Sequence, residues 1–245
     1  MTQPAPPLLR DWVRRALLDP VPRDHRQSDA AFRRRRVVAV ATIGVGGALL
    51  GWSLRLRPGD PVFYLATTLL ALCWTTGALA SGPLHLGRIR SARPEGSAEP
   101  GRLGRPWLTP LCVGLLAVGV FAAGALVVAG VPALRAPVND VLDHARFASL
   151  PVVAVITAVN GVAEELFFRG ALYAALGVRY AVAGSTLVYT ATTVASGNAM
   201  LVFAAAVLGL LVGLERRVTG GVLAPVVTHV TWSLGMLFVL PPLMG

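Results

Sequence analysis

The sequence predicts an all-α protein, a polytopic transmembrane bundle of about seven helical spans. Of its 245 residues, 55% are hydrophobic and 14% are charged, whereas soluble domains carry about 25% charged residues. Most of its apolar runs approach the roughly 20 residues that a helix needs to cross the hydrocarbon core. The runs cover residues 37–54, 61–82, 107–131, 150–176, 180–195, 199–214 and 221–240.

Residues 1–36 precede the first apolar run and carry nine arginines. Apolar residues from Leu8 to Leu17 recur at helical spacing, which is typical of a short helix on anionic lipid. A solvated basic arm that only sets topology explains the segment equally well. Because the first apolar run begins at Val37, behind four consecutive arginines, we interpret it as a retained span and not as a cleavable signal peptide.

The pattern divides the rest of the chain into three parts. Residues 37–82 predict an N-terminal transmembrane hairpin, and residues 83–106, rich in Pro, Gly, Ser and Arg, predict a flexible cytosolic linker. Residues 107–245 form the expected core. Within it, residues 132–149 resemble an interfacial helix, and the run 199–214 is short enough to be tilted or sheltered by its neighbours.

Arginine placement predicts the topology. A seven-span count brings the arm, the linker, Arg179 and the pair Arg216-Arg217 to one side, which the positive-inside rule makes cytosolic. We therefore expect a bacterial inner (plasma) membrane protein with a cytosolic N-terminus and a cavity that opens toward the cytosolic leaflet. The same rule accounts for the net charge of +10 without a nucleic-acid partner. Cys73 and Cys112 both fall in apolar runs, so no disulfide is indicated.

A glutamate pair, Glu164-Glu165, interrupts the apolar run 150–176. A carboxylate at mid-membrane depth costs roughly 2.5–3.5 kcal/mol, so such a pair indicates chemistry, transport or a fixed internal salt bridge. Residues four apart share a helix face, so Arg169 can neutralise Glu165. Glu164 then remains free, on a face shared with Asn160, as a candidate general base.

His229 is the only histidine inside an expected span, and Ser233 lies four residues further on the same face. A lone intramembrane histidine is usually a packed, hydrogen-bonded residue. The glutamate pair favours instead a histidine that meets Glu164 from another span.

These residues resemble the CPBP family of CAAX-prenyl-protease and bacteriocin-processing (Abi) intramembrane proteins. The run Glu164-Glu165-Leu-Phe-Phe-Arg169-Gly170 matches the family motif E-E-x-x-x-R. The stretch from Arg217 to Ser233 is similar to its closing H-x-x-x-N motif with its lead-in. The resemblance covers roughly residues 132–241 and implies a CAAX-protease-like helical core.

The resemblance implies intramembrane peptide hydrolysis of membrane-associated peptides or proteins. Glu164 would activate water, Glu165 and Arg169 would support it, and His229 would donate to the oxyanion. Two positions depart from the family pattern. Thr193 stands where the histidine of F-x-x-x-H is expected, and Ser233 replaces the closing asparagine. Neither can act as a base near neutral pH.

We expect no metal or other cofactor, because catalytic zinc usually takes three protein ligands, and only one histidine lies within a span. Three functions remain open: an intramembrane endopeptidase; a catalytically impaired relative that acts as a membrane binding or scaffold protein; and a proton-coupled transporter. The sequence shows no inverted repeat and no second acidic span, which counts against the transporter.

Overall fold

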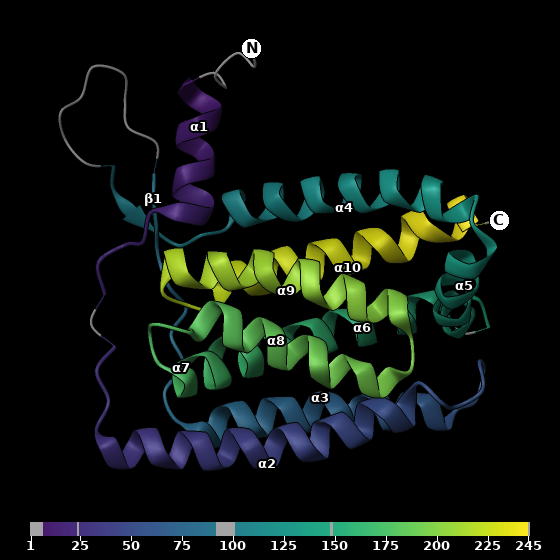
Figure 1. Ribbon diagram of the computed structural model, residues 1–245, viewed down its shortest axis with the longest axis horizontal. Coiled ribbons are helices and arrows are strands. Elements are labelled where there is room, and N and C mark those ends of the chain that lie inside the picture. The colour runs from purple at the N-terminus through teal and green to yellow at the C-terminus, as the bar shows by residue number, and fades with distance from the viewer. Residues whose placement is uncertain (1–6, 24, 92–100, 148, 245) are drawn as a thin grey trace.

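The computed structural model describes residues 7–23, 25–91, 101–147 and 149–244. Helices run antiparallel through the bundle, with the α2–α3 hairpin along one side, α4 and α10 along the other, and α6, α8 and α9 between them (Figure 1). The helices are α1 (Pro7–Val13), α2 (Asp29–Ser53), α3 (Val62–Ser81), α4 (Leu108–Ala129), α5 (Pro132–Arg146), α6 (Leu150–Glu165), α7 (Tyr173–Leu176), α8 (Ala181–Thr193), α9 (Ala199–Thr219) and α10 (Leu223–Met244).

Shorter elements complete the described residues. Two π-helical turns, η1 (Arg14–Leu18) and η2 (Leu166–Leu172), continue α1 and α6, and a 3₁₀ turn, η3 (Val194–Ser196), ends α8. Strands β1 (Ile89–Arg90) and β2 (Leu103–Gly104) form a small antiparallel ribbon. The protein is thus mostly helical, as predicted.

Six helices within the described residues are long and apolar enough to cross a membrane, one fewer than the expected seven. The chain is therefore a multi-pass membrane protein. The difference is α8, which runs through the bundle against α9 but has only 13 residues. At 1.5 Å per residue it covers about 20 Å, which is shorter than the hydrocarbon core that a full span crosses.

Helix α9 is longer than expected. Its N-terminus is capped by Asn198, whose side chain accepts hydrogen bonds from the backbone N–H groups of Met200 and Leu201. It continues through the charged residues 215–217 and ends at Gly220, which has φ +71°. The charges suggested a loop, but only the left-handed glycine stops the helix. A span of 21 residues results.

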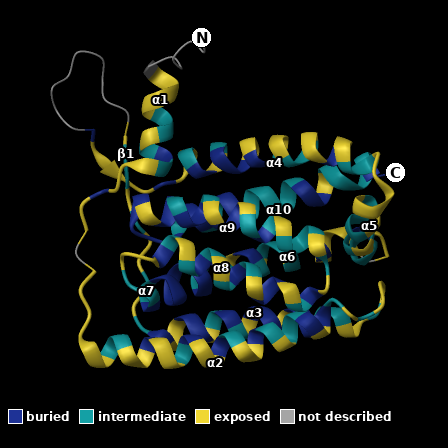
Figure 2. Ribbon diagram, in the orientation of Figure 1, coloured by how far each residue is buried: buried dark blue, intermediate teal, exposed yellow. Residues whose placement is uncertain are grey.

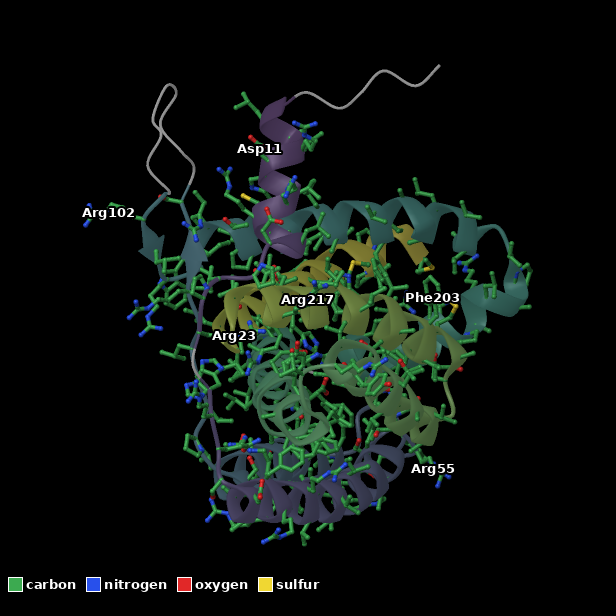
Figure 3. The ribbon with its side chains drawn as sticks, turned by 60° about the vertical axis from the view of Figure 1, so that its left-hand side comes forward. Asp11, Arg23, Arg55, Arg102, Phe203 and Arg217 are labelled. Atoms are coloured by element: carbon green, nitrogen blue, oxygen red, sulfur yellow. The ribbon has the colours of Figure 1, made fainter. Side chains whose placement is uncertain are left out.

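The two ends of the bundle differ in charge. Residues 1–36, 83–106, 179 and 216–217 contain seventeen of the 22 arginines. The described parts of these segments lie at one end, which we call the arginine-rich end (Figure 1). Helix α5 crosses the opposite end, beside the α2–α3 turn, as expected of an interfacial helix (Figure 1). In Figure 3, Arg23 and Arg217 lie side by side, and a hydrogen bond joins the Arg23 guanidinium to the carbonyl of Arg217.

The described part of the linker is held against the core. The backbone N–H of Arg88 donates to the carbonyl of Thr219, and that of Val222 donates to the carbonyl of His85. Gly87 and Gly221 approach so closely that a Cβ on either would clash with the backbone of the other. Residues 85–88 are therefore part of the folded structure and not the flexible connection that we expected. Residues 92–100 of this linker lie outside the described residues.

Trp74 joins the hairpin to the core. Its ring lies 4.9 Å from the ring of Phe167 and 5.0 Å from that of Phe168. Gly46 on α2 faces the same indole and leaves no room for a Cβ. Buried residues gather at this centre, whereas the outer faces of α2 and α4 are exposed (Figure 2). Many of the exposed side chains are leucine or valine, as expected where helices face lipid.

We predict that Trp74→Ala lowers the free energy of unfolding by about 3–5 kcal/mol, because it leaves a cavity between three helices. Trp52→Ala, at an indole that is 41% exposed, should cost less than 1 kcal/mol. Reversible denaturation in mixed micelles measures both. Equal losses would show that Trp74 does not anchor the hairpin.

Candidate active site

The glutamate pair lies where α6 passes into the π-helical turn η2. Arg169 lies within that turn, and its Nη1 donates to Oε1 of Glu165 at 3.0 Å, with both side chains fully buried. The structure thus brings together the two residues that the four-residue spacing placed on one face. Single π-turns inserted in α-helices are frequent at functional sites.

Glu165 also contacts the histidine of α10. Nδ1 of His229 lies 2.7 Å from Oε1 of Glu165, and its Nε2 lies 4.0 Å from Oε2 of Glu164. We expected His229 to meet Glu164, whereas its short hydrogen bond is to Glu165. One carboxylate oxygen therefore accepts from both Arg169 and His229, and the imidazole lies between the two glutamates.

Glu164 occupies a different environment from its neighbour. The hydroxyl of Tyr189 on α8 donates to its Oε2 at 2.6 Å. Its side chain is 18% exposed, whereas that of Glu165 is 0% exposed. Among the described residues, no hydrogen bond reaches Oε1 of Glu164, and that oxygen is not fully enclosed. It is therefore the carboxylate of the pair that a substrate can reach.

Arg169 connects the pair to two further helices. Its Nη2 donates to the carbonyl of Gly209 on α9 at 3.1 Å, and its guanidinium lies 4.6 Å from the centre of the Tyr189 ring. A Cβ at Gly209 would lie 3.1 Å from Nη2, so the small residue permits this approach. The guanidinium is fixed from three sides.

A cavity of about 280 Å³ adjoins Glu164. Four of the six predicted site residues line it, while Glu165 and Arg169 lie behind its wall. The four are Glu164, Thr193, His229 and Ser233. Asn160, which the spacing placed on the face of Glu164, lines it too. The structure thus collects side chains from three separate helices around one space.

This cavity lies in the half of the bundle away from the arginine-rich end. Its walls include the C-terminal end of α2, the N-terminal half of α3 and Val141 of α5. These walls thus lie away from the end at which we expected the cavity to open. The arginine count shows which end of the bundle is basic, whereas the position of the cavity depends on how the helices pack.

The two positions that depart from the family pattern differ in their hydrogen bonds. Oγ1 of Thr193 donates to the carbonyl of Tyr189 at 2.9 Å, within its own helix. Ser233 makes no hydrogen bond to any other described residue through its side chain. Of these two hydroxyls, only that of Ser233 is thus an uncommitted donor.

Sequence reasoning missed two polar residues. Tyr189, four residues before Thr193 at the first position of F-x-x-x-H, is the residue whose hydroxyl reaches Glu164. Glu215 was placed just beyond a span, but it lies in α9, 2% exposed, where Oγ1 of Thr228 donates to it at 2.9 Å. A second span therefore does carry an acid, contrary to our expectation. The signal for Glu215 was the glycine pair 220–221, which marks the end of the helix.

Metal ligation finds no support in the arrangement. Within the residues that the structure describes, no three His, Cys, Asp or Glu side chains form a group suited to a metal ion. Cys73 and Cys112 are both free. Independence from a metal remains a prediction, which rests on the chemistry of the Glu164 site.

Fold and site together define a multi-pass helical membrane protein with a buried acid–histidine cluster beside a cavity. Residues 146–235, from the end of α5 into α10, match the family described as type II CAAX prenyl endopeptidase Rce1-like. This segment is a domain of that protease family, and the match confirms the resemblance. All six predicted site residues lie within it. The comparisons with curated proteins and with solved structures found no match.

We predict that Glu165→Gln lowers the free energy of unfolding by about 3–5 kcal/mol, because it removes the charge that neutralises a fully buried guanidinium. Glu164→Gln should cost only about 1 kcal/mol, because it alters one hydrogen bond at a cavity wall. Denaturant unfolding of the two variants compares isosteric changes at adjacent positions. The assignment fails if Glu164→Gln is the more destabilising.

Proposed function

We propose that the protein is an intramembrane endopeptidase in which Glu164 activates water to hydrolyse peptide bonds of membrane-associated peptides or proteins. One observation carries the proposal: of two adjacent glutamates, one is fully enclosed by Arg169 and His229, and the other faces a cavity. The family of residues 146–235 is a protease family, which supports peptide hydrolysis as the reaction.

The geometry leaves room for the attacking water. Oε2 of Glu164 and Nε2 of His229 are 4.0 Å apart, and a water within about 2.8 Å of both satisfies normal hydrogen-bond lengths. Glu164 takes one proton from this water as its oxygen bonds to the substrate carbonyl carbon. The carbonyl π-electrons move to oxygen, which gives a tetrahedral oxyanion.

His229 is placed to stabilise that oxyanion. In its doubly protonated form the ring donates to Glu165 through Nδ1 and has an Nε2–H that faces Glu164 and the cavity. The Nε2–H then donates to the oxyanion, with the Ser233 hydroxyl as a second donor on the same wall. Glu165 and Arg169 act as positioning residues that fix the imidazole.

The cycle closes through Glu164. The protonated carboxyl returns its proton to the amide nitrogen as the C–N bond breaks, which releases an amine and a carboxylic acid. The hydrogen bond from Tyr189 to Oε2 fixes the carboxylate of Glu164 throughout this cycle. No metal or cofactor enters any step.

A specific observation favours the second candidate, a catalytically impaired relative that binds a membrane partner. Thr193 uses its only hydroxyl proton within α8, so no imidazole or free donor stands at that position. In that case the cavity would retain a peptide without cutting it. The two candidates differ in turnover and not in binding.

We place the arginine-rich end at the cytosolic face of a bacterial inner membrane, with the N-terminus inside. Support comes from the sixteen described arginines gathered there, against four in the segments at the opposite end. The cavity then lies in the outer half of the membrane, so a substrate segment enters from the extracytosolic leaflet.

We predict that Glu164→Gln lowers kcat by at least 10²-fold, because the amide cannot accept the water's proton. Fluorogenic membrane-tethered peptides and protein in lipid nanodiscs provide the assay, with Asp143→Asn as an acid-to-amide control outside the cavity. Thr193→His should raise turnover if that position limits the reaction. Peptide binding without cleavage in the wild type and in Thr193→His would establish the second candidate.

We predict that the thiol introduced by Pro58→Cys, in the α2–α3 turn, reacts with a membrane-impermeant maleimide added to intact cells. The thiol introduced by Arg88→Cys should react only after lysis. Cys73 and Cys112 are first replaced by alanine to give a silent background. The reverse labelling pattern would invert the proposed orientation and bring the cavity to the cytosolic leaflet.

A further inference from the structure

A second cavity, of about 230 Å³, lies at the arginine-rich end between the start of α2, the linker and the end of α9. We call it the basic pocket. Among the described residues that line it, none is acidic and six are basic: His25, Arg26, Arg34, Arg35, His85 and Arg216. The basic pocket is separate from the cavity beside Glu164 and shares no lining residue with it.

Arg35 enters the basic pocket from α2 and is only 5% exposed. Its guanidinium donates to Oε1 of Gln27 at 3.2 Å, Oγ of Ser81 at 3.4 Å and the carbonyl of Pro83 at 3.1 Å. All three acceptors are neutral. Hydrogen bonds therefore fix this cation, but nothing among them balances its charge.

Arg216 enters from α9 and is also 5% exposed. Its Nε donates to the carbonyl of Arg169 at 2.6 Å, and its guanidinium lies 4.9 Å from the centre of the Tyr173 ring. Among the described residues, its two terminal nitrogens make no hydrogen bond. They remain available to the basic pocket.

Within the part of the chain that the structure describes, neither Arg35 nor Arg216 has a carboxylate within 4.0 Å. Burying a charge without a counter-charge is costly, and buried arginines are normally paired. The rings of His25 and His85 stack at 3.7 Å beside them. Burial, together with the positive charges of Arg216 and Arg35, lowers the pKa of His85. The field inside the basic pocket is thus strongly positive, and an anion would relieve it.

We infer that the basic pocket binds a phosphate group between Arg34, Arg35 and Arg216. Guanidinium groups donate paired N–H bonds to phosphate oxygens, a match that a point charge does not offer. The basic pocket lies where α2 begins and α9 ends, at the depth expected for lipid headgroups. The phosphate therefore belongs either to an anionic phospholipid headgroup or to a free phosphate compound.

Calorimetry on the delipidated full-length protein in an uncharged detergent tests this inference. Inorganic phosphate and a short-chain phosphatidylglycerol are titrated separately, with chloride at equal ionic strength as the blank. We expect saturable one-site binding of at least one of them. Tighter binding of the phosphatidylglycerol identifies a headgroup site, and binding of inorganic phosphate alone identifies a free phosphate compound.

Two matched pairs of variants locate the site. Arg34→Gln should weaken binding about tenfold, whereas Arg33→Gln, at an equally exposed neighbour outside the basic pocket, should leave it unchanged. Arg216→Gln should abolish binding, and Arg217→Gln, exposed on the next position of α9, should not. The Arg34 pair tests the inference even where Arg216→Gln fails to fold.

Equal weakening by Arg33→Gln and Arg34→Gln would show only general surface attraction and would overturn the proposal. Absence of saturable binding by either ligand would overturn it too. Since the readout is binding, the outcome is independent of whether Glu164 catalyses hydrolysis.

Discussion

The structure depends on one shared hydrogen-bond acceptor, Oε1 of Glu165. Arg169 donates to it from the following turn, and His229 donates to it from α10. Arg169 in turn donates to the carbonyl of Gly209 on α9. Helices α6 and α10 thus meet at this buried oxygen, and α9 joins them through Arg169. Removing that carboxylate leaves a buried guanidinium without its counter-charge, so the site and the bundle are stabilised by the same contact.

Adjacent positions on a helix point about 100° apart, and this geometry gives the two glutamates different roles. Glu165 points into the packed centre, where it accepts hydrogen bonds from Arg169 and His229. Glu164 points toward the cavity, where the single hydrogen bond from Tyr189 leaves an oxygen uncommitted. Glu164 can leave this oxygen uncommitted because the adjacent Glu165 makes the hydrogen bonds to Arg169 and His229. A lone glutamate in this helix would have to serve both purposes.

Local patterns in the sequence predicted the local features. Apolar runs located the helices, and the four-residue spacing located the Glu165–Arg169 ion pair. Contacts between distant segments were harder, because periodicity does not state which faces meet. His229 lies 4.0 Å from Glu164, as expected, but its short hydrogen bond is to Glu165, and the group hydrogen-bonded to Glu164 is the hydroxyl of Tyr189. Glu215 was missed because its charged neighbours resembled a loop, although the helix ends only at Gly220.

Arg169 also links the buried acid–histidine cluster to the basic pocket. Its side chain donates to Glu165 in that cluster, while its backbone carbonyl accepts from Nε of Arg216 at the wall of the basic pocket. That carbonyl lies in the π-helical turn, where backbone bonding departs from the α-helical pattern and a carbonyl can turn toward another helix. An anion held by Arg216 would therefore act on the same turn that holds the Glu165–Arg169 pair. The basic pocket and the cavity beside Glu164 share no lining residue. Arg169 nevertheless contacts both Arg216, through its carbonyl, and Glu165, through its side chain.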